Sequence, residues 1–213
     1  MQYSVFAHGT SLHIESLGAI ASSTVVGWGT VLRFKAPVGR QVDDLPLVYA
    51  DVELGTWCHI SIPSTHATFG ARSPQLESIT LLVDTTHCHI SEIHVYDGVD
   101  FLEALGGLKG DYLRLRDSRD VNPEIDPPWG TGTYDNTMAL RRRRRLFSAV
   151  GISFYACVRH NDLIDKNGIL SGPPWPDSIL TFAGAGAQFY VPDPISRETV
   201  KAQPIIQIMP RDH

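Results

Sequence analysis

The sequence has little of several features that define common classes of protein. Its 213 residues include only three cysteines, an odd and sparse set that does not make a disulfide framework. Each cysteine lies in an apolar, strand-like run, which favours a buried thiol. No apolar stretch reaches the roughly 18 residues of a membrane-spanning helix, and the first residues lack the pattern of a signal peptide. We therefore expect a cytoplasmic protein that has no membrane partner.

Charge is also scarce. Charged residues make up 19% of the chain against 43% hydrophobic residues, and the formal net charge is −5. This composition excludes a disordered chain and disfavours a nucleic-acid binder, whose affinity comes largely from neutralising phosphates. The exception is a run of five arginines, Arg141 to Arg145. It is either an anion-binding patch or a charged loop or edge strand that discourages edge pairing, and we expect no nucleic-acid partner.

Motifs for cofactor chemistry and for nucleophilic catalysis are missing. The chain has no G-x-S-x-G, no P-loop, no G-x-G-x-x-G that opens a helix and no EF-hand loop. His87 and His89 are spaced to share one strand face, as metal ligands can. A zinc site needs three or four ligands, however, and no motif with metal-ligand spacing accompanies this pair. We therefore predict no metal site and no cofactor.

What the chain has in abundance is β-type segments. Residues 56–62, for example, alternate so that Trp57 and His59 face one way while Cys58 and Ile60 face the other. Some ten such runs occur along the whole chain at intervals of roughly 8–15 residues, and only Val99 to Leu105 has helical spacing. This pattern predicts an all-β protein, an antiparallel β-sandwich (jelly-roll-like) of about ten strands with at most one short helix.

One domain over residues 1–213 accounts for the length, because a chain of this size buries a sufficient core by itself. Long loops are expected at 63–76, 117–138 and 171–178, which are rich in glycine, proline and polar residues. The second of these, about 20 residues long, is unusual in a compact domain and is often functional when it occurs.

Residues 79–98 form the longest run of β-branched and apolar residues. We expect a core hairpin that turns near Asp84 to Thr86. The apolar positions are even at Cys88 and Ile90 but odd at Ile93 and Val95, so the alternation slips at Ser91-Glu92. An extra residue that resets the pleat is a β-bulge.

The bulge has a consequence for the polar residues of this stretch. It predicts that four of them lie on the non-core face of one strand, which a turn at Asp97-Gly98 ends. These are His87, His89, His94 and Tyr96. A histidine close to a carboxylate can act as a general acid or base, so we select His94, Asp97 and His59 as candidate catalytic residues. The alternative is a hydrogen-bonded structural turn.

Several short motifs are distributed along the chain. They are His8-Gly9, the GWGT run at residues 27–30, the W-x-HI-x-IP run at 57–63 and the strand end at 93–98. In these motifs, and in the late GIS-x-Y and ILTFAGAGAQF segments, the chain resembles a family of uncharacterised bacterial and fungal proteins. The resemblance covers most of the chain but leaves out the region 100–140. It implies one β-sandwich domain and carries no activity over.

Two proline-stiffened loops supply candidate ligand-binding aromatics, Trp129 with Tyr134 and Trp175. Rigid aromatic rings beside polar groups suit stacking on a sugar or another small molecule. The alternative is that each tryptophan pins its own loop. With His89 and Tyr96 these residues complete our predicted ligand-binding set.

The sequence therefore predicts a protein that binds a small molecule or a carbohydrate. It is either lectin-like or a cofactor-independent enzyme, and in the second case a cyclase, isomerase or lyase that uses His/Asp acid–base chemistry. The alternative is a structural or self-assembling interaction protein without catalysis. A homodimer stays open as its state of assembly.

Overall fold

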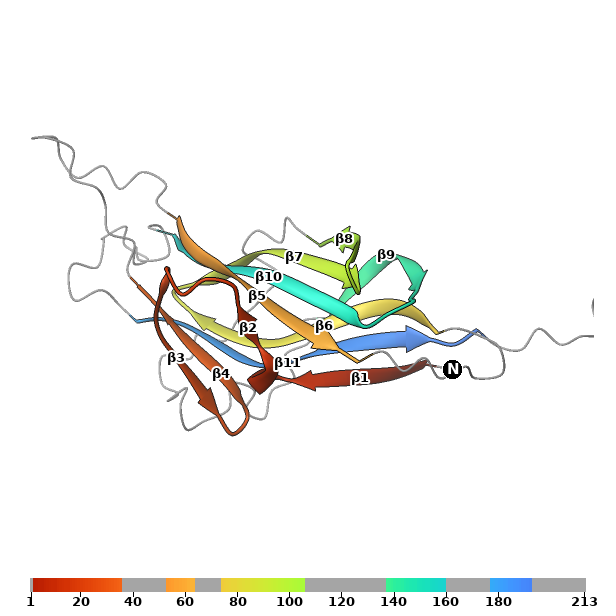
Figure 1. The fold of residues 1–213 in the computed structure, drawn as a ribbon, viewed down its shortest axis with the longest axis horizontal. Coiled ribbons are helices and arrows are strands. Elements are labelled where there is room, and N and C mark those ends of the chain that lie inside the picture. The colour runs from red at the N-terminus through yellow and green to blue at the C-terminus, as the bar shows by residue number, and fades with distance from the viewer. Residues whose placement is uncertain (1, 36–52, 64–73, 106–136, 160–176, 193–213) are drawn as a thin grey trace, which may run out of the picture.

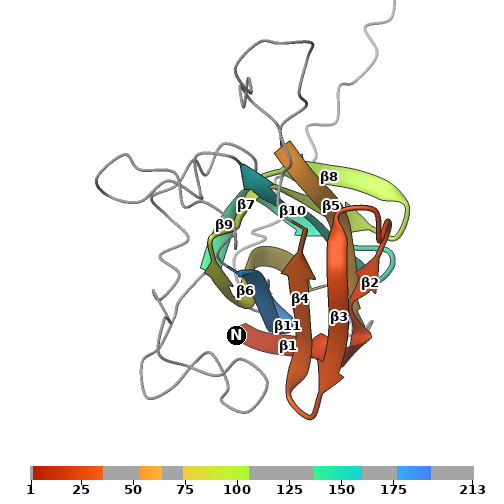
Figure 2. The same ribbon diagram turned by 90° about the vertical axis from the view of Figure 1, so that its left-hand side faces the viewer.

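The structure is a computed structural model that describes residues 2–35, 53–63, 74–105, 137–159 and 177–192. Two antiparallel sheets face each other across one apolar core (Figures 1 and 2). The predicted all-β antiparallel sandwich is thus confirmed, with eleven strands among the described residues. Within the described ranges the only helical element is one 3₁₀ turn, η1 (Gly9–Ser11).

The first sheet has six strands: β1 (Gln2–His8), β3 (Ile20–Val26), β4 (Gly29–Phe34), β6 (Gln75–Thr86), β9 (Thr137–Arg145) and β11 (Ser178–Tyr190). Their order is β3-β4-β11-β6-β9, and β1 also pairs with β11. With 13 residues, β11 is long enough to pair with β6 along one side and with β4 and then β1 along the other.

The second sheet has five strands, in the order β2 (His13–Ile14), β5 (Glu53–Ile62), β10 (Val150–Arg159), β7 (His89–Asp97) and β8 (Asp100–Ala104). The spacing of residues 99–105 allowed one short helix, but this segment contains the strand β8 instead. The turn after Asp97 returns the chain alongside β7, and Asp100 pairs with Asp97 there. Pairing with a neighbouring strand outweighs a weak local helical preference.

The core is made of the inward side chains of both sheets. Leu81 on β6, Ile93 on β7, Phe154 on β10 and Phe182 on β11 have at most 1% of their surface exposed. The rings of Phe154 and Phe182 meet across the two sheets with their centroids 5.3 Å apart. Burial of each such side chain stabilises the fold by about 1.5–3 kcal/mol.

Residues 79–98 are divided between the two sheets, so the expected hairpin was wrong. β6 belongs to the first sheet and β7 to the second, and the chain crosses between them at His87 and Cys88. His87 has a φ of 49°, the left-handed region that suits an abrupt change of direction. The crossing lets the apolar faces of both strands point into one core from opposite sides.

The predicted β-bulge at Ser91-Glu92 is confirmed. On β10, Tyr155 pairs with Glu92 and Ala156 pairs with Ile90, which leaves Ser91 as the extra residue. Ile90 and Ile93 consequently both point into the core.

The outward face of β7 carries three of the four residues that were predicted for it. His89, His94 and Tyr96 lie there and are half-buried, whereas His87 lies in the crossing before the strand.

Close packing around β11 explains the small residues in its sequence. One bulky neighbour of β11 is Phe6, since a Cβ added to Gly186 would lie 2.5 Å from a carbon of the Phe6 ring. Gly29 at the start of β4 also has no room for a side chain, because an added Cβ would lie 2.2 Å from the carbonyl oxygen of Phe182. The neighbouring Thr30 Oγ1 donates a hydrogen bond of 2.8 Å to the carbonyl of Gly9.

The five arginines lie on β9, an edge strand of the first sheet. Residues 140–143 bulge out opposite the single residue Glu77. The Arg143 guanidinium donates to the Glu77 carboxylate at 2.6 Å, which lowers the pKa of that carboxyl, and it also stacks over the ring of Tyr190. Arg141 lies 3.4 Å from the buried Glu103. At least two of the arginines therefore neutralise carboxylates at a sheet edge.

Candidate functional site

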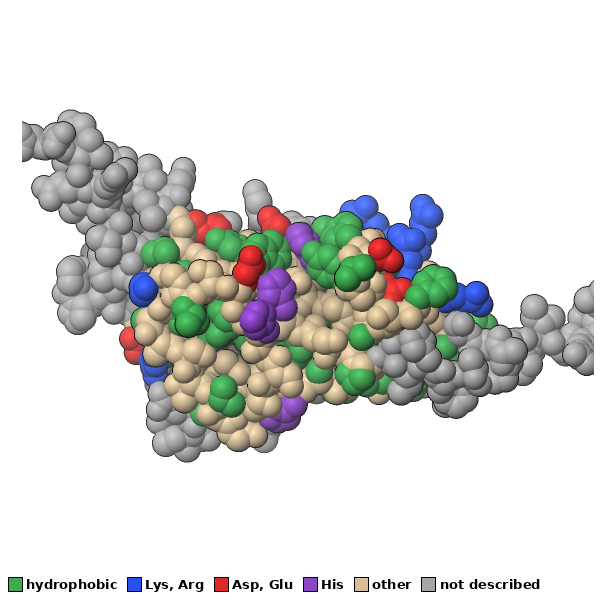
Figure 3. All heavy atoms as spheres, in the orientation of Figure 1, with side chains coloured by type: hydrophobic (Ala, Val, Ile, Leu, Met, Phe, Trp, Pro, Cys, Tyr) green, Lys and Arg blue, Asp and Glu red, His purple; other side chains and the backbone are tan. Residues whose placement is uncertain are grey.

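Aromatic and histidine side chains collect on the outward side of the five-stranded sheet. We call this side the outer face, and its principal members are Trp57, His59, His94, Tyr96, Phe101, Ser153 and Tyr155. The alternation of each strand places them there, because the residues between them, such as Cys58, Ile60 and Val95, are buried in the core. Figure 3 shows histidines next to hydrophobic side chains on the side turned to the viewer.

His94 is the centre of an aromatic cluster on the outer face. Its ring centroid lies 4.8 Å from that of Trp57, 5.5 Å from that of Phe101 and 6.3 Å from that of Tyr96. Phe101 keeps 56% of its surface exposed, and Trp57 and Tyr96 are half-buried. The cluster is therefore anchored in the sheet and still offers ring surface to a ligand.

The polar contacts of His94 fix the orientation of its ring. Nε2 lies 3.4 Å from Oε2 of Glu92, and Nδ1 lies 3.4 Å from the hydroxyl of Tyr96. A carboxylate and a hydroxyl thus flank the two ring nitrogens. The carboxylate next to His94 is Glu92, not the predicted Asp97.

A second polar group lies beside the aromatic cluster. The register of the sheet aligns His13, His59, Ser153 and His94 in one row across β2, β5, β10 and β7. Nδ1 of His59 lies 2.8 Å from Oγ of Ser153, and its Nε2 lies 3.5 Å from Oε2 of Glu15. A histidine between a hydroxyl and a carboxylate can take a proton from the hydroxyl.

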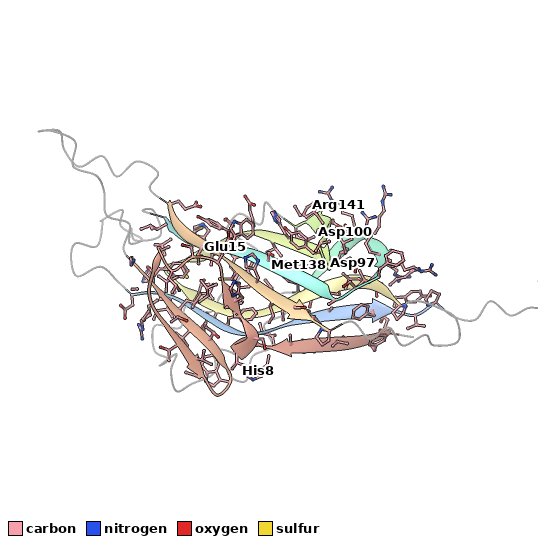
Figure 4. All side chains as sticks on the ribbon, viewed as in Figure 1. His8, Glu15, Asp97, Asp100, Met138 and Arg141 are labelled. Atoms are coloured by element: carbon pink, nitrogen blue, oxygen red, sulfur yellow. The ribbon has the colours of Figure 1, made fainter. Side chains whose placement is uncertain are left out.

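The structure does not bring Asp97 to the outer face. Asp97 is buried on the opposite side of β7, where its Oδ2 accepts a hydrogen bond of 2.7 Å from the amide of Phe147 and its Oδ1 one of 2.6 Å from Ser148. In Figure 4 it lies well to the right of Glu15. Two backbone donors satisfy this carboxylate, so it braces the turn between β9 and β10.

The remaining predicted residues have different positions. His89 lies on the outer face further along β7, with its Nε2 3.2 Å from Sγ of Cys157. Trp129, Tyr134 and Trp175 lie outside the described residues. The structure thus joins His59, His94 and Tyr96 on one face and places His89 at its margin.

Sequence reasoning missed Phe101, Ser153, Tyr155 and the role of Glu15. Phe101 lies in the segment with helical spacing, where alternation gives no strand face. Alternation along β10 was the signal available, because Ser153 and Tyr155 alternate with the buried Ile152, Phe154 and Ala156.

No protein-family model matches the chain, and no curated protein matches it. Over the part of the chain that the structure describes, no helix is long and apolar enough to cross a membrane. The fold and the site together define a β-sandwich with an aromatic and histidine-rich outer face.

Proposed function

We propose that the protein binds a carbohydrate on the outer face of its five-stranded sheet. The observation that carries this proposal is the cluster of Trp57, Tyr96 and Phe101 around His94, with ring surface open to solvent. A sugar has an apolar C–H face that packs on aromatic rings and hydroxyl groups that need hydrogen-bonding partners.

The polar groups at the margins of the cluster fit this ligand class. The carboxylates of Glu15 and Glu92 have side-chain exposures of 60% and 54%, so both are accessible to hydroxyl groups. A hydrogen bond to a charged group contributes about 1.5–3 kcal/mol. Burial of an aromatic ring contributes a similar amount. One stacked ring and one such hydrogen bond together contribute about 3–6 kcal/mol, which corresponds to dissociation constants from a few millimolar to tens of micromolar.

The test is a binding screen of soluble oligosaccharides by calorimetry with the full chain. For any sugar that binds, Trp57→Ala should weaken binding by at least about tenfold, the equivalent of about 1.4 kcal/mol. The matched control is Trp28→Ala, which removes a half-buried tryptophan between β3 and β4 of the other sheet. A sugar whose affinity falls equally in both variants, or no binding across the panel, would contradict the proposal.

The contacts of His59 favour catalysis as a second candidate function. His59 lies between the hydroxyl of Ser153 and the carboxylate of Glu15, the arrangement that makes a serine nucleophilic. This replaces the expected His/Asp pair, since Asp97 is directed elsewhere. A fluorophosphonate probe tests it: labelling that Ser153→Ala abolishes would support catalysis, and an unlabelled native protein would contradict it.

Strand β3 favours self-assembly as the non-catalytic alternative. It is an edge of the first sheet, its seven residues contain no charged side chain, and five in succession are exposed. An uncharged edge is a template for pairing with another chain. A homodimer that Ser23→Lys converts to monomer, measured by light scattering, would support this alternative, and a monomeric native protein would contradict it.

The state of the cysteines bears on the proposed cytoplasmic location. Cys58, Cys88 and Cys157 are all buried thiols, and thiols persist in a reducing compartment.

A further inference from the structure

Three potential metal-binding side chains meet at the margin of the outer face, beyond the aromatic cluster. They are Glu53 on β5, Cys157 on β10 and His89 on β7. One carboxylate oxygen, the thiol sulfur and one imidazole nitrogen all lie within 4.8 Å of one another. Between Cys157 Sγ and His89 Nε2 the distance is 3.2 Å.

The sheet register produces this meeting. Cys157 pairs directly with His89 on one side and with Gly55 on the other. Glu53 is two residues from Gly55 along β5, so its side chain emerges on the same face as that of Cys157, diagonally across the strands. Because β10 is hydrogen-bonded on both sides, the backbones that carry the three side chains have fixed positions before any ligand binds.

The donor atoms match the preferences of zinc. Zinc binds thiolate sulfur at about 2.3 Å, imidazole nitrogen at about 2.0–2.1 Å and carboxylate oxygen at about 2.0–2.2 Å, in tetrahedral geometry. These bond lengths put the ligand atoms about 3.4–3.6 Å from one another. The sulfur–nitrogen distance is already close to that value. Glu53 is an exposed, flexible side chain, and its carboxylate oxygen lies at most 4.8 Å from the other two atoms, so a small movement brings it into bonding position.

The thiol argues against a site for a hard cation. Magnesium and calcium take oxygen ligands, whereas a thiolate with an imidazole selects zinc among the common divalent ions. Cys157 is completely buried although it lies on the outward side of its strand, and it is not part of the apolar core cluster. Its sulfur therefore faces His89 and Glu53 instead of the core residues that surround Cys58.

We propose that Glu53, His89 and Cys157 bind a zinc ion as three protein ligands. Three ligands leave the fourth tetrahedral position for water or for an atom of a bound molecule. The site is next to Tyr155, whose ring packs against Gly55 between the zinc ligands and Trp57. Zinc binding is independent of the carbohydrate proposal, because none of the three ligands belongs to the aromatic cluster.

The test is titration of the metal-free, reduced full chain with cobalt(II), which replaces zinc and gives visible and near-ultraviolet absorption. We expect tetrahedral d–d bands and a thiolate-to-cobalt charge-transfer band that reach a plateau at one equivalent and disappear when zinc is added. Cys157→Ser should abolish the charge-transfer band. His89→Ala and Glu53→Gln should weaken cobalt binding by more than about 100-fold and about tenfold or more, respectively.

The matched control is Cys88→Ser, the same substitution at another buried cysteine. Cys88 Sγ donates a hydrogen bond of 3.0 Å to the carbonyl of Ile179, and a serine hydroxyl can replace it. This variant should keep the full cobalt spectrum. Glu53→Gln changes an exposed side chain, so it retains the fold if the buried substitutions do not.

Each result decides the proposal. The expected spectrum, lost in Cys157→Ser and kept in Cys88→Ser, supports it. A native chain without the charge-transfer band overturns it and leaves His89 and Cys157 as a thiol–imidazole hydrogen bond. So does a cobalt affinity that Glu53→Gln leaves unchanged, since Glu53 would then not be a ligand.

Discussion

Nδ1 of His59 lies 2.8 Å from Oγ of Ser153, although the two residues are 94 positions apart in the sequence. Glu15, directly after β2, approaches the same imidazole from its other side. Three strands that are distant in sequence thus contribute to one row of polar groups beside the aromatic cluster. The outer face of the five-stranded sheet is the part of the described structure where chemically capable side chains converge.

The bulge at Ser91 makes a sharp prediction about chain length. Deletion of Ser91 should leave a regular β7 in which Glu92 still pairs with Tyr155 and Ile90 with Ala156. We expect a folded protein whose free energy of unfolding, measured in urea, changes by less than about 1 kcal/mol.

Deletion of Val95 is the control for that experiment. Here β7 pairs in regular register with β10, so the deletion reverses the faces of the residues on one side of it and moves Tyr96 toward the core. It should cost more than about 3 kcal/mol. Equal losses in the two deletions would show that Ser91 is not an inserted bulge residue.

Two glycines of the GWGT run should differ in their tolerance of a methyl group. A Cβ at Gly29 would lie 2.2 Å from the carbonyl oxygen of Phe182, whereas a Cβ at Gly27 meets no atom within 4 Å. Gly29→Ala should therefore destabilise the fold by about 3 kcal/mol or more. Gly27→Ala should change the melting temperature little, and a reversed order would contradict the packing of β4 on β11.

Asp97 should act on stability and not on ligand binding. Asp97→Ala leaves the amides of Phe147 and Ser148 without their acceptors, which should cost about 3 kcal/mol in a urea titration. Asp97→Asn retains one acceptor and should lose about half as much. Loss of carbohydrate binding in a folded Asp97→Asn protein would return this residue to the functional site.

The Cys58 thiol should make stability depend on pH in alkali. Burial raises the pKa of Cys58 from 9.0 to about 12. The folded protein therefore keeps this proton at pH values where the unfolded chain has lost it. The resulting stability is full below pH 9 and falls as the pH rises toward 12, by up to about 1.4 kcal/mol per pH unit. Cys58→Ala should show a shallower fall, and equal slopes would contradict this assignment.

Local alternation was sufficient to predict the fold class and the faces of individual strands. The directions of Trp57 and His59 on β5 follow from a period of two, and the bulge follows from one slip in that period. Neither result depends on which strands are neighbours.

Strand partners were not predictable in the same way. Residues 79–98 look alike whether β6 and β7 pair in one sheet or face each other across the core, because both arrangements bury the same apolar residues. The segment 99–105 shows the same limit, since only its pairing with β7 makes it a strand.

The candidate site was predictable only in part for the same reason. His94 and Asp97 are close in sequence, yet three residues along a strand place them on opposite faces. His59 and Ser153, or Cys157 and His89, come together through register across β10, which no single-strand pattern contains.

The most direct test of the central claim is a two-dimensional NMR titration with the soluble oligosaccharide that binds best. It follows the histidine ring and tryptophan indole signals. We predict that the signals of His59, His94 and Trp57 move together and saturate at one binding constant. Those of His8 on β1 and of Trp28 in the turn between β3 and β4, both in the other sheet, should stay in place. Shifts confined to His8 and Trp28, or no shift with any sugar, would contradict a carbohydrate site on the outer face.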